Sequence, residues 1–210
     1  MHKISLILSV HDYLLFIDTE ASGLPKNWEL PYSAAGNWPY AVQISWLIFD
    51  KEGIKVKEED HYINDNDFTI SREASNVHHL RPDFLGINGK RRKTILRLLT
   101  EDIHLYQPML VGHFLDLDRR IIGAEYFRAD LQDPSTGLAG YCTMKGTSHL
   151  QPNPNLRYLR LGDLYHLLFG ASLEHPHDAL ADATATAACF FELRKRGQIK
   201  PENISIATRL

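Results

Sequence analysis

The sequence of 210 residues contains only two cysteines, Cys142 and Cys189, and they do not lie at metal-chelating spacing. Two cysteines do not build a disulfide framework or a cysteine-based zinc site. The chain also lacks an excess of basic residues, because 23 Lys and Arg stand against 26 Asp and Glu, for a net charge of −3. Attraction of the whole molecule to a polyanion is therefore excluded, and any contact with phosphate groups must be local.

Long hydrophobic runs are missing as well, since none approaches the roughly 20 residues that a membrane span requires. The apolar stretch 3–10 is short, has no small-residue cleavage site and continues directly into a predicted strand, so we do not interpret it as a secretion signal. The protein is therefore expected in the cytoplasm. No repeat or linker divides the chain, which favours one domain over residues 1–210, with a core at about 12–196. The tail 198–210 either packs on this domain or binds a partner.

Hydrophobic periodicity predicts an α/β fold. The compact apolar run 13–17 is typical of a central strand that is covered on both faces. Strands at 41–49 and 54–63 follow, so the first three strands should form an antiparallel meander. The remaining expected elements are helices at 90–105, 116–127, 161–169 and 178–196, and short strands at 108–111 and 141–144.

Two acidic residues stand at the end of the first predicted strand. Asp18 and Glu20 are two residues apart in an extended segment, so their side chains lie on one face while Thr19 points away. Neighbouring carboxylates repel each other unless a cation lies between them, and Mg²⁺ and Mn²⁺ prefer such oxygen ligands. Taken alone, the pair equally fits a solvated loop that follows a buried strand.

A third acid, Asp118, lies in the first turn of the helix expected at 116–127, directly after the strand at 108–111. Ligands of open sheets collect beyond the carboxyl ends of the strands, so Asp18 and Asp118 should meet there if their two strands run parallel. The alternative interpretation is an ordinary acid at a helix start, which the helix dipole favours.

The third segment with polar candidates lies at the start of the last predicted helix. Asp178 is a plausible N-cap, which leaves His177 in the preceding loop and Asp182 in the first turn. An imidazole in that position can accept a proton from water near neutral pH. Alanine at every second position from 179 to 187 would let the helix approach the sheet, although these alanines also fit a plain packing helix. Together the three segments predict a divalent-metal site with a general base, suited to hydrolysis of a phosphodiester.

These residues resemble the three motifs of the DEDD exonucleases of the histidine subtype. That family includes the proofreading epsilon subunit of bacterial DNA polymerase III, ribonuclease T and oligoribonuclease. The matching motifs occur in order between about residues 12 and 195. They are Asp18-Thr-Glu20 followed by Ala-Ser-Gly23, His113 with Asp118 five residues later, and His177-x-Ala179-x-x-Asp182.

The resemblance implies a ribonuclease H-like fold, in which a mixed sheet of the meander plus parallel strands is flanked by helices. It implies removal of nucleoside 5′-monophosphates from the 3′ end of DNA, in proofreading or repair, with two Mg²⁺ or Mn²⁺ ions. By motif, Asp18, Glu20 and Asp182 would hold the ion that binds the attacking water, and Asp18 would bridge to the second ion. Asp118 would complete the set through water, and His177 would be the general base.

Residues that contact the substrate are expected near these motifs. Thr19, His78 in the segment Val77-His-His-Leu80, and Trp38 are the candidates for substrate binding. A frayed single strand calls for aromatic stacking surfaces and a few phosphate contacts. The loop 24–39 offers aromatics that could instead form a small core of their own. Phosphate contacts could come from a basic run, which fits a solvated helix face equally well. This run consists of Lys90, Arg91, Arg92, Lys93 and Arg97.

Three positions depart from the family pattern without removing an expected metal ligand. Phe114 replaces the asparagine after the middle histidine, Leu117 replaces the aromatic before the aspartate, and His79 replaces a glycine. Substrate choice therefore stays open between a 3′ end of DNA and an RNA end trimmed by the same chemistry, because that choice depends on how closely the pocket approaches the 2′-hydroxyl. A non-catalytic nucleic-acid-binding or polymerase-docking module with the same fold is the other alternative, and a polymerase partner is left open.

Overall fold

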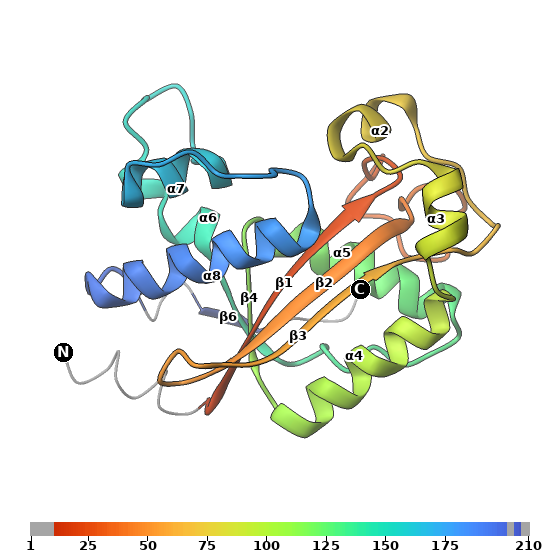
Figure 1. Cartoon of the computed structure of the whole chain (residues 1–210), viewed down its shortest axis with the longest axis horizontal. Coiled ribbons are helices and arrows are strands. Elements are labelled where there is room, and N and C mark those ends of the chain that lie inside the picture. The colour runs from red at the N-terminus through yellow and green to blue at the C-terminus, as the bar shows by residue number, and fades with distance from the viewer. Residues whose placement is uncertain (1–10, 201–203, 207–210) are drawn as a thin grey trace.

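The computed structural model describes residues 11–200 and 204–206. These residues form a six-stranded mixed sheet in the order β3-β2-β1-β4-β5-β6, with helices on both faces (Figure 1). The strands are β1 (Tyr13–Ala21), β2 (Ala41–Asp50), β3 (Lys55–Tyr62), β4 (Met109–Gly112), β5 (Ala139–Cys142) and β6 (Ile204–Ile206). The helices are α2 (Arg72–His78), α3 (Pro82–Asn88), α4 (Arg92–Tyr106), α5 (Leu115–Arg128), α6 (Thr143–Gly146), the 3₁₀ turn η1 (Ser148–Leu150), α7 (Leu161–Phe169) and α8 (Ala179–Lys195).

The strand directions confirm the predicted mixed sheet. β1, β2 and β3 form the antiparallel meander, and β4 pairs parallel with β1. β5 pairs parallel with β4. The parallel pairing of β1 with β4 matters most for function, because it brings the carboxyl ends of both strands to one edge of the sheet.

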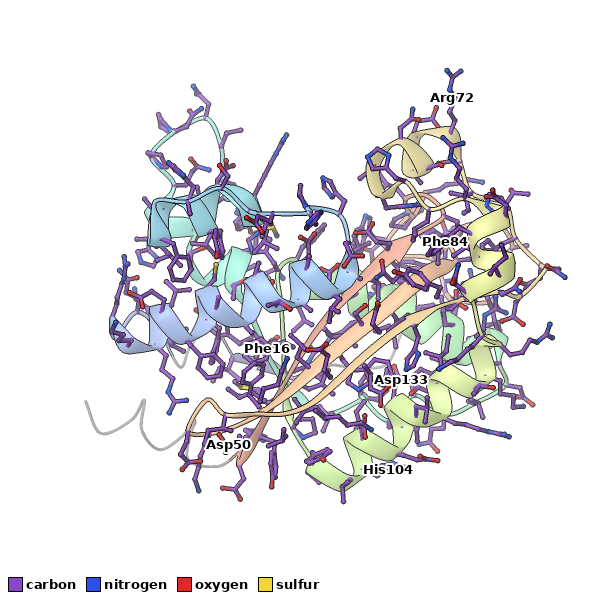
Figure 2. All side chains as sticks on the ribbon, viewed as in Figure 1. Phe16, Asp50, Arg72, Phe84, His104 and Asp133 are labelled. Atoms are coloured by element: carbon purple, nitrogen blue, oxygen red, sulfur yellow. The ribbon has the colours of Figure 1, made fainter. Side chains whose placement is uncertain are left out.

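β1 is apolar at successive positions because each of its faces is covered by a separate core. Leu14 and Phe16 belong to the cluster that packs beneath α7 and α8, where the Phe16 ring lies 5.5 Å from the Phe190 ring (Figure 2). Leu15 and Ile17 point to the opposite face, into the cluster under α4 and α5. A strand buried on both faces reads as a continuous hydrophobic run.

Two predicted strand ends needed correction, and two segments without a predicted element gained one. β1 continues to Ala21 because Glu20 is still paired with Gln43 of β2, so both acids of the first motif lie inside the strand. β5 ends at Cys142, and the next residues form α6. The segment 64–89, for which no element was predicted, forms α2 and α3. Part of the tail, Ile204–Ile206, pairs antiparallel with β5 as β6.

The apolar stretch 3–10 lies outside the described residues. Among the helices of residues 11–200, none combines the length and apolar character needed to cross a membrane.

A buried ion network fixes the end of the loop 24–39. Glu125 of α5 is fully buried, contacts Arg92 and Arg128, and accepts the backbone N–H of Ala41 at 3.0 Å. Arg128 also donates to the backbone carbonyls of Trp38 at 2.6 Å and of residue 39 at 3.0 Å. One carboxylate thus holds α4, α5 and the start of β2 together.

Replacing Glu125 with glutamine should lower the free energy of unfolding by about 3 kcal/mol, because two largely buried guanidinium groups lose their shared anion. Urea denaturation measures this change. The matched control is Asp12→Asn, which removes an exposed ion pair with Lys51 at 2.8 Å and should leave stability within experimental error. A loss at Glu125 no larger than that at Asp12 would show that the network contributes little.

Candidate active site

The three polar segments meet at one edge of the sheet. The end of β1 carries Asp18 and Glu20, and α5 begins directly after the parallel strand β4. The first turn of α8 lies against the end of β1, with α2 on the far side of that strand end (Figure 1). The topology therefore gathers segments that are up to about 160 residues apart, as the motif spacing indicates.

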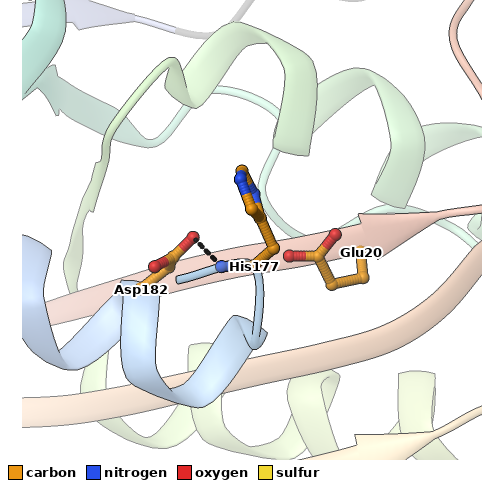
Figure 3. A group of neighbouring side chains, drawn as sticks. All are labelled: Glu20, His177 and Asp182. Carbon is orange, nitrogen blue, oxygen red and sulfur yellow. Dashed lines mark hydrogen bonds between the residues drawn. The ribbon is translucent and has the colours of Figure 1, made fainter. Parts of the chain in front are cut away.

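The closest group consists of Glu20, His177 and Asp182. One ligand atom from each lies within 4.8 Å of the others, and Figure 3 shows Glu20 reaching from β1 toward the two residues at the start of α8. The backbone N–H of His177 donates to Asp182 Oδ2 at 3.2 Å. His177 is exposed and has a φ of 66°, a left-handed conformation that is uncommon outside glycine and frequent at functional sites.

Asp118 is bound to β1 from the opposite face. The Thr19 hydroxyl donates to Asp118 Oδ1 at 2.8 Å, because Thr19 points toward α5 while its two neighbours point toward α8. Asp118 is buried. Thr19 was predicted to contact substrate, and in this structure its side-chain hydroxyl is engaged with Asp118.

The pKa values show how close the carboxylates are to one another. Burial raises the pKa of Asp18 well above its usual range, and the charges of Asp118, Asp182 and Glu20 raise it further. Burial and the charges of Asp182 and Asp118 raise the pKa of Glu20 to about 8. Burial raises the pKa of Asp118 to about 7 against the opposing hydrogen bond from Thr19. The four acids thus interact as one group.

The donor set fits a hard divalent cation. Asp182 Oδ1 is buried and has no hydrogen-bond partner among the described residues. The pKa of Asp182 is also raised, by burial first, against the hydrogen bond from His177. Clustered carboxylate oxygens are the ligands that Mg²⁺ and Mn²⁺ prefer, and a cation among them would remove both the mutual repulsion and the unsatisfied oxygen.

Gln43 is a site residue that sequence reasoning missed. This fully buried residue of β2 lies opposite Glu20 and accepts the backbone N–H of Ala179 at 3.2 Å. Its amide nitrogen donates to Asp60 at 2.9 Å and to Asp178 at 3.3 Å. The only signal in the sequence was a polar side chain within a strongly apolar strand, since buried polar groups need partners.

Asp178 caps α8 as predicted, because its side chain accepts the backbone N–H of Ala181 at 3.0 Å. The alanines behind it give the close approach that was expected, since Ala179, Ala183 and Ala187 are buried against the sheet. The cap and the small side chains together determine where His177 and Asp182 lie.

The other two histidines of interest differ in role. His78 at the end of α2 is buried, its Nδ1 accepts the Leu80 N–H at 3.0 Å, and its Nε2 has no partner among the described residues. Burial lowers the pKa of His78, and charges on His79 and His177 would lower it further. His113 instead bonds to the Thr143 hydroxyl and the Leu159 carbonyl, and burial lowers its pKa to about 4, so it has a structural role.

Two expectations about substrate contact need correction. Trp38 is only 2% exposed and its indole N–H donates to the Leu30 carbonyl at 3.0 Å, so the loop 24–39 does fold onto a small core of its own. In the basic run, Arg92 is buried between Asp67 and Glu125, and Arg91 pairs with Asp65 at 3.1 Å. Arg92 therefore serves the fold and is not a free phosphate ligand, whereas the Arg91 side chain remains largely exposed.

No family model matches the chain, and no curated protein matches it by sequence. Solved structures do match. E. coli exonuclease I in complex with a dT13 oligonucleotide has a TM-score of 0.71 at 18% identity, covering 88% of this chain and 41% of that chain. The zinc-bound form of an E. coli exonuclease I–ssDNA complex has a TM-score of 0.70 at 19% identity, covering 89% and 41%. A third structure shows 3′-end specific recognition of histone mRNA stem-loop by a 3′-exonuclease. Its TM-score is 0.69 at 12% identity, and the match covers 94% of this chain and 91% of that chain.

The chain has the ribonuclease H-like fold of these exonucleases. At such identities the likeness concerns the fold, and this chain spans 41% of the length of exonuclease I.

The raised pKa values predict how stability depends on pH. The folded protein binds protons at Glu20 and Asp118 more tightly than the unfolded chain, so stability falls as the pH rises through the folded pKa values of about 8 and 7. Without a divalent metal, the free energy of unfolding should drop by about 1.5 kcal/mol between pH 7 and 8.5. Urea denaturation in EDTA measures this slope. The Glu20→Gln variant should show a smaller pH dependence, and saturating Mn²⁺ should abolish this dependence in the wild-type protein. An equal slope in wild type, in Glu20→Gln and in wild type with Mn²⁺ would refute the electrostatic interpretation.

Gln43→Met should weaken Mn²⁺ binding about tenfold, because residues that orient metal ligands typically contribute 10- to 100-fold to affinity. Methionine keeps the volume and removes the bonds to Ala179 and Asp178 that hold the start of α8. Calorimetric titration with Mn²⁺ measures the change. The matched control is Ser45→Ala, since Ser45 is buried two residues along the same strand and bonds to Asp60 at 2.6 Å, with no hydrogen bond to α8 among the described residues. Equal affinities in the two variants would contradict the positioning role.

Proposed function

We propose that this chain is a metal-dependent 3′–5′ exonuclease that releases nucleoside 5′-monophosphates from the 3′ end of single-stranded DNA. One observation carries the proposal: four acids from three distant segments converge at the carboxyl ends of parallel strands, with an exposed histidine beside them. A buried acid cluster would be destabilising without a compensating cation. The histidine has no packing role that would account for its place.

Asp18, Glu20, Asp118 and Asp182 would hold two Mg²⁺ or Mn²⁺ ions. Such ions supply positive charge at the entering and leaving oxygens of an in-line displacement. His177 would accept the proton of the attacking water, because its ring is exposed and stands beside Glu20 and Asp182. The hydrogen bond from its own backbone N–H to Asp182 holds the loop in the turn that presents the ring.

His78 would contact the terminal nucleotide. Burial favours its neutral form, and its Nε2 is free of hydrogen bonds among the residues described, so it can bond to a hydroxyl or to a base edge. The position of His78 at the end of α2, the helix beyond the end of β1, supports this role.

The structural neighbours support single-stranded DNA as the substrate, since E. coli exonuclease I has been seen with dT13 and dA16 oligonucleotides. The motif resemblance supports kinship with the epsilon subunit and, with it, a role in proofreading beside a polymerase or in repair.

RNA is the second candidate substrate. The 3′-exonuclease of histone mRNA stem-loop recognition matches 94% of this chain and 91% of its own, whereas exonuclease I matches over 41% of its length. Competition between oligonucleotides of one sequence that differ only in the sugar would distinguish the two substrates.

Asp18→Ala should reduce hydrolysis of a 5′-labelled single strand by at least a thousandfold in Mn²⁺ while leaving the fold intact, because it removes bridging charge and little core volume. The assay follows shortening from the 3′ end on a gel, with EDTA as the metal-free reference. His177→Ala should lower kcat about a hundredfold with Mn²⁺ affinity nearly unchanged.

Two control variants alter an acid and a histidine that lie in comparable local positions outside the site. Asp163→Asn alters an acid in the first turn of another helix, α7, and His175→Ala alters an exposed histidine two residues before His177. Both should keep wild-type rates. Failure of the wild-type protein to shorten any DNA or RNA strand in Mn²⁺ would favour a non-catalytic binding module, and wild-type rates in Asp18→Ala would refute the site.

A further inference from the structure

A second cavity of about 790 Å³ lies on the outer side of α5, between that helix, the loop 24–39 and the segment 129–138. None of the acids or histidines of the candidate active site lines it. Its walls include three aromatic residues and two arginines, namely Trp28, Tyr32, Phe127, Arg119 and Arg120. Aromatic rings interleaved with guanidinium groups are the combination that binds unpaired bases and their phosphates.

The aromatic rings are presented on a rigid base. Trp38, buried in the loop, contacts Trp28 and Tyr32 edge-on, with ring centroids 6.0 and 5.7 Å away. Tyr32 packs against Gly123 of α5, where a Cβ atom would lie 2.3 Å from the tyrosine hydroxyl. Trp28 is 36% exposed and Phe127 is 53% exposed, so both retain surface for a ligand. Large rings held in place lose little conformational entropy when a base stacks on them.

The arginines of the cavity are free to bind an anion. Neither Arg119 nor Arg120 has a carboxylate within 4.0 Å in the part of the chain that the structure describes. Arg119 donates through Nη2 to the Leu138 carbonyl at 3.1 Å, while its buried Nε–H has no partner there. That buried Nε–H is out of reach of a ligand, so an anion would be bound by the remaining N–H groups of Arg119 and by Arg120, whose guanidinium has no hydrogen bond among the described residues and lies 5.9 Å from the Trp38 ring.

The formal charge of the cavity wall is nevertheless balanced. Arg119, Arg120 and Lys145 face Glu29, Asp116 and Asp133, of which Asp116 is paired with Lys145 and Asp133 accepts the backbone N–H of Ser135 at 2.8 Å. Binding by charge alone is therefore excluded. Stacking must supply most of the affinity, which favours a single strand with accessible bases over a duplex.

One aromatic contact links the rim of the cavity to the start of α5, the helix that carries Asp118. Trp28 lies 5.8 Å from Phe114, with the two rings tilted by 35°, and Phe114 is the residue immediately before α5. Asp118 lies in the first turn of that helix. Gly123 and Phe127 follow on the same helix, about 8 and 14 Å further along its axis at the usual rise per residue.

We propose that this cavity binds the unpaired nucleotides upstream of the scissile phosphodiester, with Trp28 and Phe127 stacking on bases and Arg119 and Arg120 contacting phosphates. The inference rests on the proposed exonuclease function, because it assumes that a 3′ end lies at the carboxylates. The strand would pass from Asp118 over Phe114 and Trp28 into the cavity, a few nucleotides away from the reaction.

Two substrates separate this cavity from the active site. The p-nitrophenyl ester of thymidine 5′-monophosphate reaches only the carboxylates, whereas a single-stranded DNA decamer reaches both. In Mn²⁺, Trp28→Ala should lower kcat/KM for the decamer about tenfold, mainly through KM, because one stacked base contributes about 1–3 kcal/mol. Its rate on the ester should stay within twofold of wild type, and Trp28→Phe should restore most of the decamer activity.

Phe169→Ala, which alters an exposed ring on α7, is the control for loss of surface aromatics and should change neither rate. Equal losses on both substrates in Trp28→Ala, or no loss on the decamer, would overturn the proposal. If wild-type protein cleaves neither substrate, the exonuclease function itself fails. Fluorescence anisotropy of a labelled decamer then tests the cavity directly: weaker binding by Trp28→Ala than by Phe169→Ala supports it, and equal binding refutes it.

Discussion

Mutual repulsion among four carboxylates is the constraint on which the rest of this structure depends. Burial raises the pKa values of Asp18, Glu20 and Asp118, and the charges of neighbouring acids, Asp182 among them, raise these values further. Such an arrangement opposes folding unless protons or cations compensate for it. The surrounding protein must therefore be stable enough to hold the acids in place before any ligand arrives.

That stability comes from buried apolar side chains and from hydrogen bonds around the acids. β1 and β4 are buried on both faces, and the small side chains of α8 allow the helix to lie close against them. Thr19 ties Asp118 to β1, and Gln43 ties β2 to the first turn of α8. The Thr19 bond joins β1 to α5 and the Gln43 bond joins β2 to α8, so hydrogen bonds between elements hold the acid-bearing segments in place.

Exonucleases at 12–19% identity share this fold. A fold tolerates such divergence because its core positions need only be apolar and of suitable volume. Substitution elsewhere is then tolerated, and the loop between β1 and β2 has room to acquire features of its own. In this chain that loop carries Trp28, Tyr32 and Trp38, and Glu125 and Arg128 anchor its end to α5.

The sequence alone determined the meander, the helices α4, α5, α7 and α8, and the acids of the site, because each of these follows from a local pattern of apolar residues or from residues a few positions apart. It could not determine α2 and α3, which have only seven residues each, or β6, which exists only through its pairing with β5. Tertiary structure alone decided that Trp38 is buried, that Arg92 pairs with Glu125, and that Gln43 reaches Ala179 across 136 residues of sequence. Those outcomes depend on which distant segments become neighbours, and no local pattern encodes that choice.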